Sequence, residues 1–459
     1  MNLEILILAA GKGTRMYSDL PKVLHRIGGR SMLDHVIATS LSCKPSSVHV
    51  VVGFGAGQVK KETSASFPAR RLEFVLQEQQ LGTGHAVMQV MPALSAGRDD
   101  IALVLYGDVP LIKAETLHSL LDEAGPDSLR LLTLVTQNPT GLGRIIRDDQ
   151  GSVTAIVEEK DCSEAQRSIN EINSGIMAIP VARLKTWLEK LSNSNAQGEY
   201  YLTDIVAMAV ADGVKVSALV THDEVELQGV NSKSQLAQLE RHYQMQKTEE
   251  LLKQGITLRD PSRVDIRGEL QCAADVEIDI NVLFEGDVSI GRASSIGANC
   301  VITNSQIGEA VKILPGSIIE GATIAANAVI GPNARLRPGT VIGEGAKIGN
   351  FVETKNAVIG KGSKANHLAY IGDAEIGEGC NIGAGTIFCN YDGANKHKTT
   401  LGNNVFIGSN SVLVAPVTLA DNAFVAAGSA INSDVPQGNL AVARGKQRNI
   451  SGWKRPTKK

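Results

Sequence analysis

The sequence predicts two halves of different fold: an α/β domain built on a doubly wound parallel sheet, followed by a solenoid of short parallel strands. Two observations predict them. In the first half, runs of aliphatic residues alternate with segments whose apolar residues recur at helical spacing. In the second half, an isoleucine or leucine recurs every six residues from Ile318 to Ile348. The chain has 459 residues, which is long enough for two or three domains.

The composition excludes several classes of protein. The chain has 45 Lys and Arg residues against 48 Asp and Glu residues, a net charge of −3, whereas dedicated nucleic-acid binders carry a strong basic excess. With 43% hydrophobic and 20% charged residues, the chain can bury a core and is not disordered. Its 46 glycines and only 4% aromatic residues indicate many tight corners and thin, regular layers. We therefore expect small-molecule ligands and no nucleic-acid partner.

The cysteines and the N-terminal segment indicate the cellular compartment. The six cysteines form no C-x-x-C pair, and scattered thiols of this kind fit a reducing cytosol. The N-terminus carries no basic leader, and the apolar run from Ile5 to Ala10 is far shorter than the ~20 residues that span a bilayer. We therefore expect a cytoplasmic protein with no membrane partner.

The first predicted domain covers residues 1–230. Its aliphatic runs are typical of strands buried on both faces, and the helical patterns between them predict crossover connections. Ligands of such a sheet bind beyond the carboxyl ends of the strands. The predicted strands are residues 5–8, 48–52 and 101–105, and the predicted helices are residues 31–41 and 114–123.

Residues 231–255 predict a helical linker. Leu236, Leu239 and Tyr243 lie at helical spacing, and Gly255 follows the predicted helix of residues 232–254. We expect a long, exposed helix that acts as a rigid connector.

The solenoid is predicted for residues 256–459. A six-residue period fits neither a helix nor an alternating strand, but it fits a coil in which six residues make one flat face and one corner. One aliphatic side chain of each face points inward, and the glycine that often follows it, as in Ile342-Gly343, helps the backbone turn. The six-residue phase breaks at 351–370 and at 388–401, where we expect loops that project from the coil.

The turn after the first predicted strand suggests a phosphate site. Small residues from Ala9 to Gly13 let the backbone approach a nucleotide, and Arg15 and Lys22 add positive charge. The Walker A motif does not fit, because Lys12 is followed by Gly13 rather than by Ser or Thr. Taken alone, a glycine-rich turn between a strand and a helix is more often structural.

Asp108 follows the predicted strand of residues 101–105, so its carboxylate is expected at the ligand-binding edge of the sheet. A hard oxygen ligand there suits Mg²⁺ on a nucleotide phosphate. A helix cap or a turn explains a single aspartate at this point equally well, and the residues alone leave both readings open.

Several motifs together resemble known families. Residues 8–16 with Lys22 resemble the signature of sugar-phosphate nucleotidyltransferases, which have a Rossmann-like fold, and the six-residue repeat resembles the left-handed parallel β-helix of hexapeptide acyltransferases. The whole chain resembles the bacterial bifunctional N-acetylglucosamine-1-phosphate uridylyltransferase / glucosamine-1-phosphate acetyltransferase family. Further motifs in that family's order are QEQQLGTGHA (77–86), YGDVPL (106–111), GLGRI (141–145), IVE (156–158), EINSG (171–175) and GVN (229–231).

The resemblance implies two activities. One acetylates glucosamine 1-phosphate with acetyl-CoA. The other transfers UMP from UTP to N-acetylglucosamine 1-phosphate, giving UDP-N-acetylglucosamine and pyrophosphate for cell-wall and lipopolysaccharide precursors. It also implies Mg²⁺ as cofactor and a homotrimer with the acetyl site between subunits.

The resemblance also implies the residues of the nucleotidyl site. Asp108 and Asn231 would hold Mg²⁺, Arg15 and Lys22 would stabilise the phosphates catalytically, and Gln77 would read the uracil edge. The reaction needs no covalent nucleophile, so catalysis would be positioning and charge neutralisation. The implied UTP and UDP-N-acetylglucosamine ligands are Leu8, Ala9, Ala10, Gly11, Lys22, Gln77, Gly82, Thr83, Tyr106, Gly107, Asp108, Gly143, Glu158, Asn173 and Asn231.

In the second half, the resemblance makes His367 the base that takes the proton of the amine during acetyl transfer. Asn366 precedes it where the family often has glycine, and Glu353 would orient the site. The implied ligands of glucosamine 1-phosphate are Arg337, Lys355, Tyr370 and Asn381, and those of acetyl-CoA are Ala384, Asn390, Tyr391, Ser409, Ala427 and Arg444.

Two other functions compete with this hypothesis. A nucleotidyltransferase for another sugar would use its β-helix only for structure or regulation, and His367, Lys355 and Arg337 argue against it. A sugar-nucleotide sensor without catalysis is disfavoured by Asp108 and Lys22. The basic tail from Arg444 is either a solvated end or a segment that attracts the phosphates of CoA.

Overall fold

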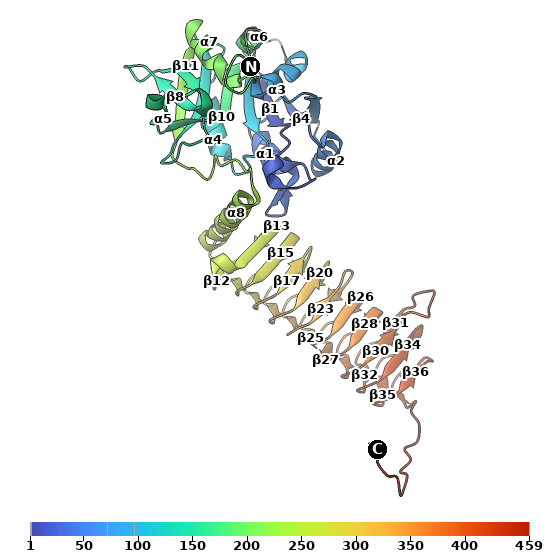
Figure 1. Ribbon diagram of the computed structural model, residues 1–459. Helices are drawn as coiled ribbons and strands as arrows, with labels where there is room; N and C mark the ends of the chain where they lie inside the picture. Colours follow the sequence, from blue (N-terminus) through green and yellow to red (C-terminus); the bar gives the residue numbers. More distant parts are fainter. Residues whose placement is uncertain (1, 71, 96, 459) are drawn as a thin grey trace. The chain divides into compact units, whose positions relative to one another are not determined.

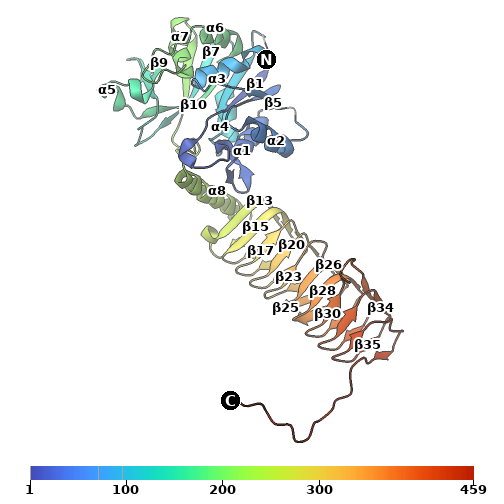
Figure 2. The same ribbon diagram turned by 45° about the vertical axis from the view of Figure 1, so that its right-hand side comes forward.

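The chain divides into two compact units, one up to Tyr243 and one from Gln244. The computed structural model describes residues 2–70, 72–95 and 97–458, and Figures 1 and 2 show them as ribbons coloured along the sequence. The division falls inside α8 (Lys233–Lys253), where the sequence predicts a helix.

The first unit is built on a twisted sheet with the strand order β11-β7-β10-β6-β1-β4-β5. Four neighbouring strands, β6, β1, β4 and β5, run parallel as predicted, whereas β10 runs antiparallel to both β6 and β7. The strands are β1 (Leu3–Ala9), β4 (Ser47–Val52), β5 (Leu72–Leu76), β6 (Ile101–Tyr106), β7 (Ser128–Val135), β10 (Glu171–Pro180) and β11 (Lys215–Thr221), with the hairpin β8 (Arg144–Arg147) and β9 (Val153–Val157) attached to β10.

Helices cover both faces of this sheet (Figure 1). Side chains of β1 alternate between two apolar clusters: Leu6 packs with α3, α6 and α7, and Ile7 packs with α1, α2 and α4. The helices are α1 (Met32–Leu41), α2 (Ala56–Ser66), α3 (Thr83–Val90), α4 (Ala114–Leu121), α5 (Glu164–Arg167), α6 (Val181–Leu188) and α7 (Ile205–Ala211), with the 3-10 turns η1 (Thr14–Met16), η2 (Lys22–Leu24), η3 (Met91–Ala93), η4 (Glu159–Asp161) and η5 (Leu202–Asp204), and the hairpin β2 (Arg26–Ile27) and β3 (Arg30–Ser31).

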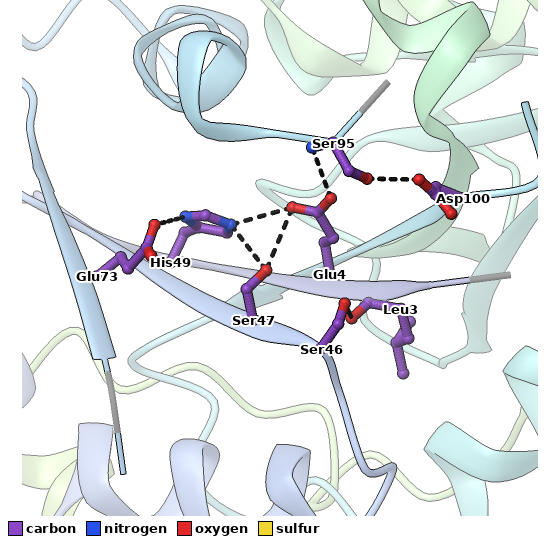
Figure 3. A network of polar contacts seen from close by, with 8 residues as sticks. All are labelled: Leu3, Glu4, Ser46, Ser47, His49, Glu73, Ser95 and Asp100. Carbon is purple, nitrogen blue, oxygen red and sulfur yellow. Dashed lines mark hydrogen bonds and ion pairs between the residues drawn. The ribbon is translucent and has the colours of Figure 1, made fainter. Parts of the chain in front are cut away.

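A buried polar network joins the amino-terminal parts of three neighbouring strands (Figure 3). The carboxylate of Glu4 accepts hydrogen bonds from the backbone N–H of Ser95 at 2.7 Å and from Nε2 of His49 at 3.1 Å. Nδ1 of His49 lies 3.3 Å from the carboxylate of Glu73. Burial raises the pKa of Glu4, but the hydrogen bonds from Ser95 and His49 outweigh it and leave that pKa below its usual value.

The second unit is a parallel β-helix. Its strands form an 11-stranded sheet and a 15-stranded sheet. The second sheet covers two faces because long strands such as β26 (Glu353–Ile359) and β28 (Tyr370–Ile376) run around a corner. One column of inward side chains contains Ile296, Ile313, Ile330 and Ile348, all buried. Gly291 shows why the corners need glycine: a Cβ there would lie 2.5 Å from the backbone carbon of Gly308 in the next coil.

The repeat differs from the prediction at Ile318, which was expected to point inward. Ile318 is 43% exposed, and the buried residue of this coil is its neighbour Ile319. The six-residue phase slips here by one residue, because adjacent coils of the helix differ slightly in length. The predicted inward positions Ile324, Ile330 and Ile342 are confirmed.

Only one of the two predicted loops projects from the coil. Across residues 351–370 the register continues without interruption, since Lys347 pairs with Lys364 and Lys364 pairs with Asn381. The expectation of a projecting loop there is wrong. Residues 390–398, by contrast, form an insertion between β30 and β31.

Helix α8 is less exposed than predicted. Leu239 is buried with Met16 and Ile27 in the first unit, and Leu251 is buried in the core of the second unit. Among the described residues, no helix combines the length and the hydropathy that a membrane-spanning segment needs.

The elements of the second unit are β12 (Thr257–Leu258), η6 (Pro261–Arg263), β13 (Val264–Cys272), β14 (Glu277–Ile278), β15 (Val282–Ile290), β16 (Ser295–Ile296), β17 (Val301–Thr303), β18 (Gln306–Ile307), β19 (Lys312–Ile313), β20 (Ile318–Glu320), β21 (Thr323–Ile324), β22 (Val329–Ile330), β23 (Arg335–Leu336), β24 (Val341–Ile342), β25 (Lys347–Asn350), β26 (Glu353–Ile359), β27 (Lys364–His367), β28 (Tyr370–Ile376), β29 (Asn381–Ile382), β30 (Ile387–Cys389), β31 (Thr399–Leu401), β32 (Phe406–Ile407), β33 (Val412–Val414), β34 (Val417–Leu419), β35 (Phe424–Val425), β36 (Ala430–Ile431) and β37 (Leu440–Ala441).

Candidate active sites

A cleft lies where β1 and β6 end. The two strands are parallel neighbours with Leu8 opposite Tyr106, and the backbone N–H of Gly107 donates to the carbonyl of Leu8 at 3.0 Å. Their carboxyl ends therefore meet at one edge of the sheet, as a doubly wound fold requires. The cleft has a volume of about 270 Å³ and is lined by Leu8, Ala9, Ala10, Gly11, Lys22, Val23, Gln77, Gln80, Gly82, Thr83, Ala86, Tyr106, Asp108 and Glu199.

Lys22 places a positive charge at one end of this cleft. Its ammonium group donates hydrogen bonds to Oδ2 of Asp108 and, at 3.1 Å, to Oδ1 of Asn231. Gly13 makes this position possible: it has a φ of +64°, and a Cβ there would lie 2.7 Å from the Cβ of Lys22.

A backbone hydrogen bond of the preceding residue brings Asn231 to the cleft. The N–H of Val230 donates to the carbonyl of Asp108 at 2.9 Å, which brings residues far apart in the sequence together. The backbone N–H of Asn231 donates to Oε1 of Gln235 in α8 at 2.8 Å and fixes its orientation. A carboxylate oxygen and an amide oxygen thus converge on one cation.

Two glutamines after β5 organise the opposite side of the cleft. Nε2 of Gln80 donates to the carbonyl of Ala10 at 2.8 Å and holds the glycine-rich turn. Nε2 of Gln77 lies 3.2 Å from the carbonyl of Gly82. Gly82 has a φ of +107°, and a Cβ there would lie 2.6 Å from the carbonyl of Tyr200, so only glycine fits.

A second group of site residues surrounds Glu158. The backbone N–H of Asn173 donates to the carbonyl of Gly143 at 2.8 Å, and a Cβ on Gly143 would lie 3.4 Å from the Glu158 carboxylate. Thr203 Oγ1 donates to Oε1 of Glu158 at 3.0 Å, a partner that has no signal in the sequence. Burial raises the pKa of Glu158, the hydrogen bond from Thr203 lowers it, and neighbouring carboxylates add to the rise.

Tyr106 lies beside both groups. Its ring packs over Gly175, where a Cβ would lie 2.4 Å from a ring carbon. Burial, with the charges of Glu158 and Asp108 nearby, raises the pKa of the Tyr106 phenol. Arg15, in η1, is exposed, and the described residues include no hydrogen bond that joins it to the other predicted ligands.

In the β-helix, His367 ends β27 and pairs in register with Asn350 at the end of β25. Its Nδ1 lies 2.8 Å from Oδ1 of Asn350. An amide oxygen only accepts hydrogen bonds, so Nδ1 carries the proton and the lone pair of the imidazole is on Nε2. The sequence analysis missed Asn350, because a polar residue at a coil corner has no distinctive pattern.

Three of the residues predicted for acetyl-CoA, Ala384, Ser409 and Ala427, form a column that begins at His367. The parallel strands β29, β32 and β35 align Ile382 with Ile407 and Val425, so two residues further on Ala384, Ser409 and Ala427 lie on adjacent coils. The same register places His367 next to Ala384. Nη1 of Arg444 donates to the carbonyl of Ala427 at 2.8 Å and adds a cation at the end of the column.

Three of the four residues predicted to bind glucosamine 1-phosphate, Arg337, Lys355 and Tyr370, lie on the adjacent face of the coil. Arg337 and Lys355 follow aligned positions of β23 and β26, and Arg337 donates to the carboxylate of Glu353 at 2.9 Å. The hydroxyl of Tyr370 folds over Gly372, where a Cβ would lie 2.5 Å from it. Arg337, Lys355 and Tyr370 are therefore brought together.

Asn390 belongs to this acceptor group in the structure rather than to the column. Its Nδ2 donates to Asp373 and lies 3.5 Å from the Tyr370 hydroxyl. Lys396, in the same inserted loop, was not predicted. The neighbouring ammonium of Lys355 lowers the pKa of Lys396.

Two predicted ligands lie apart from both groups. Tyr391 is 60% exposed and its hydroxyl donates to the carbonyl of Gly393 within the inserted loop. Asn381 starts β29 and lies on the 11-stranded sheet between Lys364 and Phe406.

Both halves and the full chain have known relatives. The MobA-like NTP transferase domain matches residues 5–191, and the GMPPB C-terminal domain matches residues 318–429. The bifunctional protein GlmU of Stutzerimonas stutzeri is 57% identical over 459 residues, which is 100% of both chains. This chain belongs to the bifunctional GlmU family.

Other members of the GlmU family are equally similar. The bifunctional protein GlmU of Azotobacter vinelandii is 57% identical over 458 residues, covering 100% of this chain and 99% of its own. A solved nucleotidyl transferase of Methanothermobacter is 18% identical and covers 53% of this chain and 97% of its own, with a TM-score of 0.37 that is too low to bear on the fold. The family resemblance of the sequence is confirmed, and so are the nucleotidyltransferase domain and the parallel β-helix.

Proposed function

We propose that this chain catalyses two transfers at two sites. The β-helix acetylates glucosamine 1-phosphate with acetyl-CoA, and the α/β domain transfers UMP from UTP to the N-acetylglucosamine 1-phosphate formed. The observation that carries the proposal is the full-length match to bifunctional proteins, together with the polar residues that converge in each unit. We assign the two activities to residues 1–230 and 256–459, with residues 231–255 as the linker.

The cleft of the first unit supports a divalent cation held by Asp108 and Asn231. Their oxygens already converge on a positive charge, the Lys22 ammonium, and oxygen ligands of this kind suit Mg²⁺. No cluster of three His, Cys, Asp or Glu side chains was found in the described part of the chain, so phosphate oxygens would complete the site. Asp108 and Asn231 would hold the ion, and its charge would offset that of the phosphates.

The chain's own residues position the reactants. Backbone N–H groups of the turn from Ala10 to Gly13 face the phosphates, and Lys22 and Arg15 stabilise the charge on the α-phosphate and the leaving pyrophosphate. Glu158 and Asn173 hold the sugar, and Gln77 and Gly82 hold the uracil. Because the sugar phosphate attacks directly, no covalent intermediate forms.

At the second site, Nε2 of His367 takes the proton of the glucosamine amine as it attacks the thioester. Arg337, Lys355 and Lys396 provide cations for the 1-phosphate, and acetyl-CoA lies along the column of Ala384, Ser409 and Ala427. That column supports this placement because it begins next to His367. The thioester then lies beside the base, so the amine can attack it and lose its proton at one place; the amide bond forms as the C–S bond breaks and CoA leaves as a thiol.

We propose that the protein acts as a homotrimer in the cytoplasm. His367 is exposed in the single chain, so a partner surface is needed to exclude water from the acetyl site. Phe406 and Phe424 stack at 4.4 Å on the exposed 11-stranded face, with Leu440 in register beside them. An apolar stripe of this kind favours subunit contact. Sedimentation should give a mass of three chains, and a fully active monomer would contradict the proposal.

The basic tail that begins at Arg444 is exposed, and we propose that it attracts the phosphates of CoA. Lys459 lies outside the described residues. Truncation after residue 445 should raise the KM for acetyl-CoA and leave the KM for UTP unchanged. An unchanged KM for acetyl-CoA would make the tail a solvated end.

Two separate assays test the function. Acetyl-CoA with glucosamine 1-phosphate, and no UTP, should release free thiol. UTP with N-acetylglucosamine 1-phosphate and Mg²⁺, and no acetyl-CoA, should release pyrophosphate. Pyrophosphate release without any thiol release would favour a nucleotidyltransferase whose β-helix is only structural.

A further inference from the structure

The side-chain amide of Gln77 is held in one orientation. Gln77 is only 3% exposed, lines the cleft, and its backbone N–H donates to the carbonyl of Val52 at 2.8 Å. Its Nε2 lies 3.2 Å from the carbonyl of Gly82. A carbonyl oxygen only accepts hydrogen bonds, so this contact requires the NH₂ end of the amide.

The same nitrogen meets a second acceptor. Nδ1 of His85, in α3, lies 3.1 Å from Nε2 of Gln77. The NH₂ group has two hydrogens, and Gly82 and His85 take one each. The free hydrogen-bonding group of Gln77 is then Oε1, which accepts and does not donate.

His85 must be neutral, with its proton on Nε2, to accept at Nδ1. Nε2 of Gln89 lies 3.2 Å from that Nε2 and 3.4 Å from the backbone carbonyl of His85. A neutral imidazole accepts at only one nitrogen, so one of the two glutamine amides must turn its oxygen toward the ring. The contact of Gln77 with the Gly82 carbonyl is the shorter of the two carbonyl contacts, at 3.2 Å, so we assign the turned amide to Gln89.

An acceptor at this point of the cleft discriminates between nucleobases. The N3 of uracil carries a hydrogen and can donate to Oε1 of Gln77. The N3 of cytosine carries a lone pair, which would face another lone pair. A base that leaves a buried polar group unpaired is rejected more strongly than one that only loses apolar contact.

We propose that His85 is a positioning residue for base selection: it holds Gln77 with its oxygen toward the cleft and thereby favours UTP over CTP. The proposal rests on the nucleotide site proposed above. Without an acceptor at Nδ1, the Gln77 amide can turn and offer its NH₂ group to either base.

Binding of UTP and of CTP to the full-length protein, by calorimetry without sugar phosphate, tests this. His85→Leu should reduce the ratio of CTP to UTP dissociation constants at least about tenfold, because one unpaired polar group is worth about that much. His85→Asn should keep the ratio near that of the unchanged protein, since Asn Oδ1 can accept in the place of Nδ1. His118→Leu, at an exposed position of α4, is the matched control and should change nothing.

The outcomes are distinct. A ratio that is unchanged in His85→Leu, whether both affinities stay or fall together, overturns the role of His85. A ratio that falls in His85→Leu and also in His85→Asn overturns the acceptor explanation. Failure of the unchanged protein to bind UTP overturns the proposed nucleotide site instead. Thiol release by the acetyl site verifies that each variant is folded.

Discussion

Nδ1 of His367 lies 2.8 Å from Oδ1 of Asn350, the residue aligned with it in the preceding coil. This contact sets the tautomer of the imidazole: the proton is on Nδ1 and the lone pair is on Nε2. His367 also begins the column of Ala384, Ser409 and Ala427. The proposed base and the proposed acetyl-CoA site therefore lie at one corner of the coil, as direct attack of an amine on a thioester would require.

Asn350 should therefore act as a positioning residue. Asn350→Ala should lower kcat/KM for acetyl transfer about tenfold or more, since general-base catalysis is worth about 10²–10⁴. Asn350→Asp places a carboxylate beside the ring and favours imidazolium, so the acid limb of the profile should move to higher pH. Thiol release measured against pH decides it. An Asn350→Asp profile that coincides with that of the unchanged protein would exclude this role.

Lys396 should bind the phosphate of glucosamine 1-phosphate. The positive charge of Lys355 beside it lowers the pKa of Lys396, and a bound phosphate relieves that repulsion. Lys396→Met should raise the KM for glucosamine 1-phosphate about tenfold, with a smaller effect on kcat. Lys398→Met is the control, because Lys398 lies in the same loop but pairs with Glu375 of β28. Equal effects of the two changes would mean that only the general charge of the loop matters.

Glu158 should give the uridylyl reaction a sensitivity to acid. Burial raises its pKa, so it is protonated at a higher pH than an ordinary glutamate and then loses acceptor capacity toward the sugar hydroxyls. The KM for N-acetylglucosamine 1-phosphate should rise as the pH falls. Thr203→Val removes the hydrogen bond that opposes the shift, so the rise should begin at higher pH than in the unchanged protein. Both proteins are measured on the same substrate, so the titration of its phosphate affects them equally. If the rise in KM began at a lower pH in Thr203→Val than in the unchanged protein, the assignment would be contradicted.

The network around Glu4 should stabilise the first unit except in acid. The pKa of Glu4 is lowered in the folded state, so its contribution is present above the unfolded-state pKa and is lost as the pH falls through the folded-state pKa. Glu4→Gln should cost about 1–3 kcal/mol near neutral pH because buried partners lose a charged acceptor. A ligand raises the unfolding temperature of the unit that binds it, so the thermal transition whose midpoint rises when UTP is added reports on the first unit. The two proteins should converge at low pH, and a difference that grows in acid would oppose the prediction.

The regular parts of this molecule could be predicted from the sequence, because each repeats one physical requirement. Buried strands such as residues 101–105 must be aliphatic, and each flat face of the coil needs one inward aliphatic residue. The slip at Ile319 and the reversed direction of β10 were not predictable, since they depend on coil length and on how the β8–β9 hairpin connects.

The sites were only partly readable. Residues on signature turns, such as Lys22 and Asp108, were found through the family resemblance, and the structure brings them together. Asn350, Thr203 and Lys396 were not predicted, because each contacts a neighbour that is distant in the sequence or lies on another coil. A contact of that kind has no period and no motif. His85 lies inside the motif of residues 77–86, but its contact with Gln77 is visible only in the structure.

The measurement that tests the two-site account most directly follows thiol and pyrophosphate separately, with each reaction given its own substrates, in the unchanged protein and in two variants. His367→Ala should lose acetyl transfer by about two to four orders of magnitude and keep uridylyl transfer to supplied N-acetylglucosamine 1-phosphate. Asp108→Ala should do the reverse. If either change abolished both activities in a protein that remains folded, the two sites would not be independent and the account would be wrong.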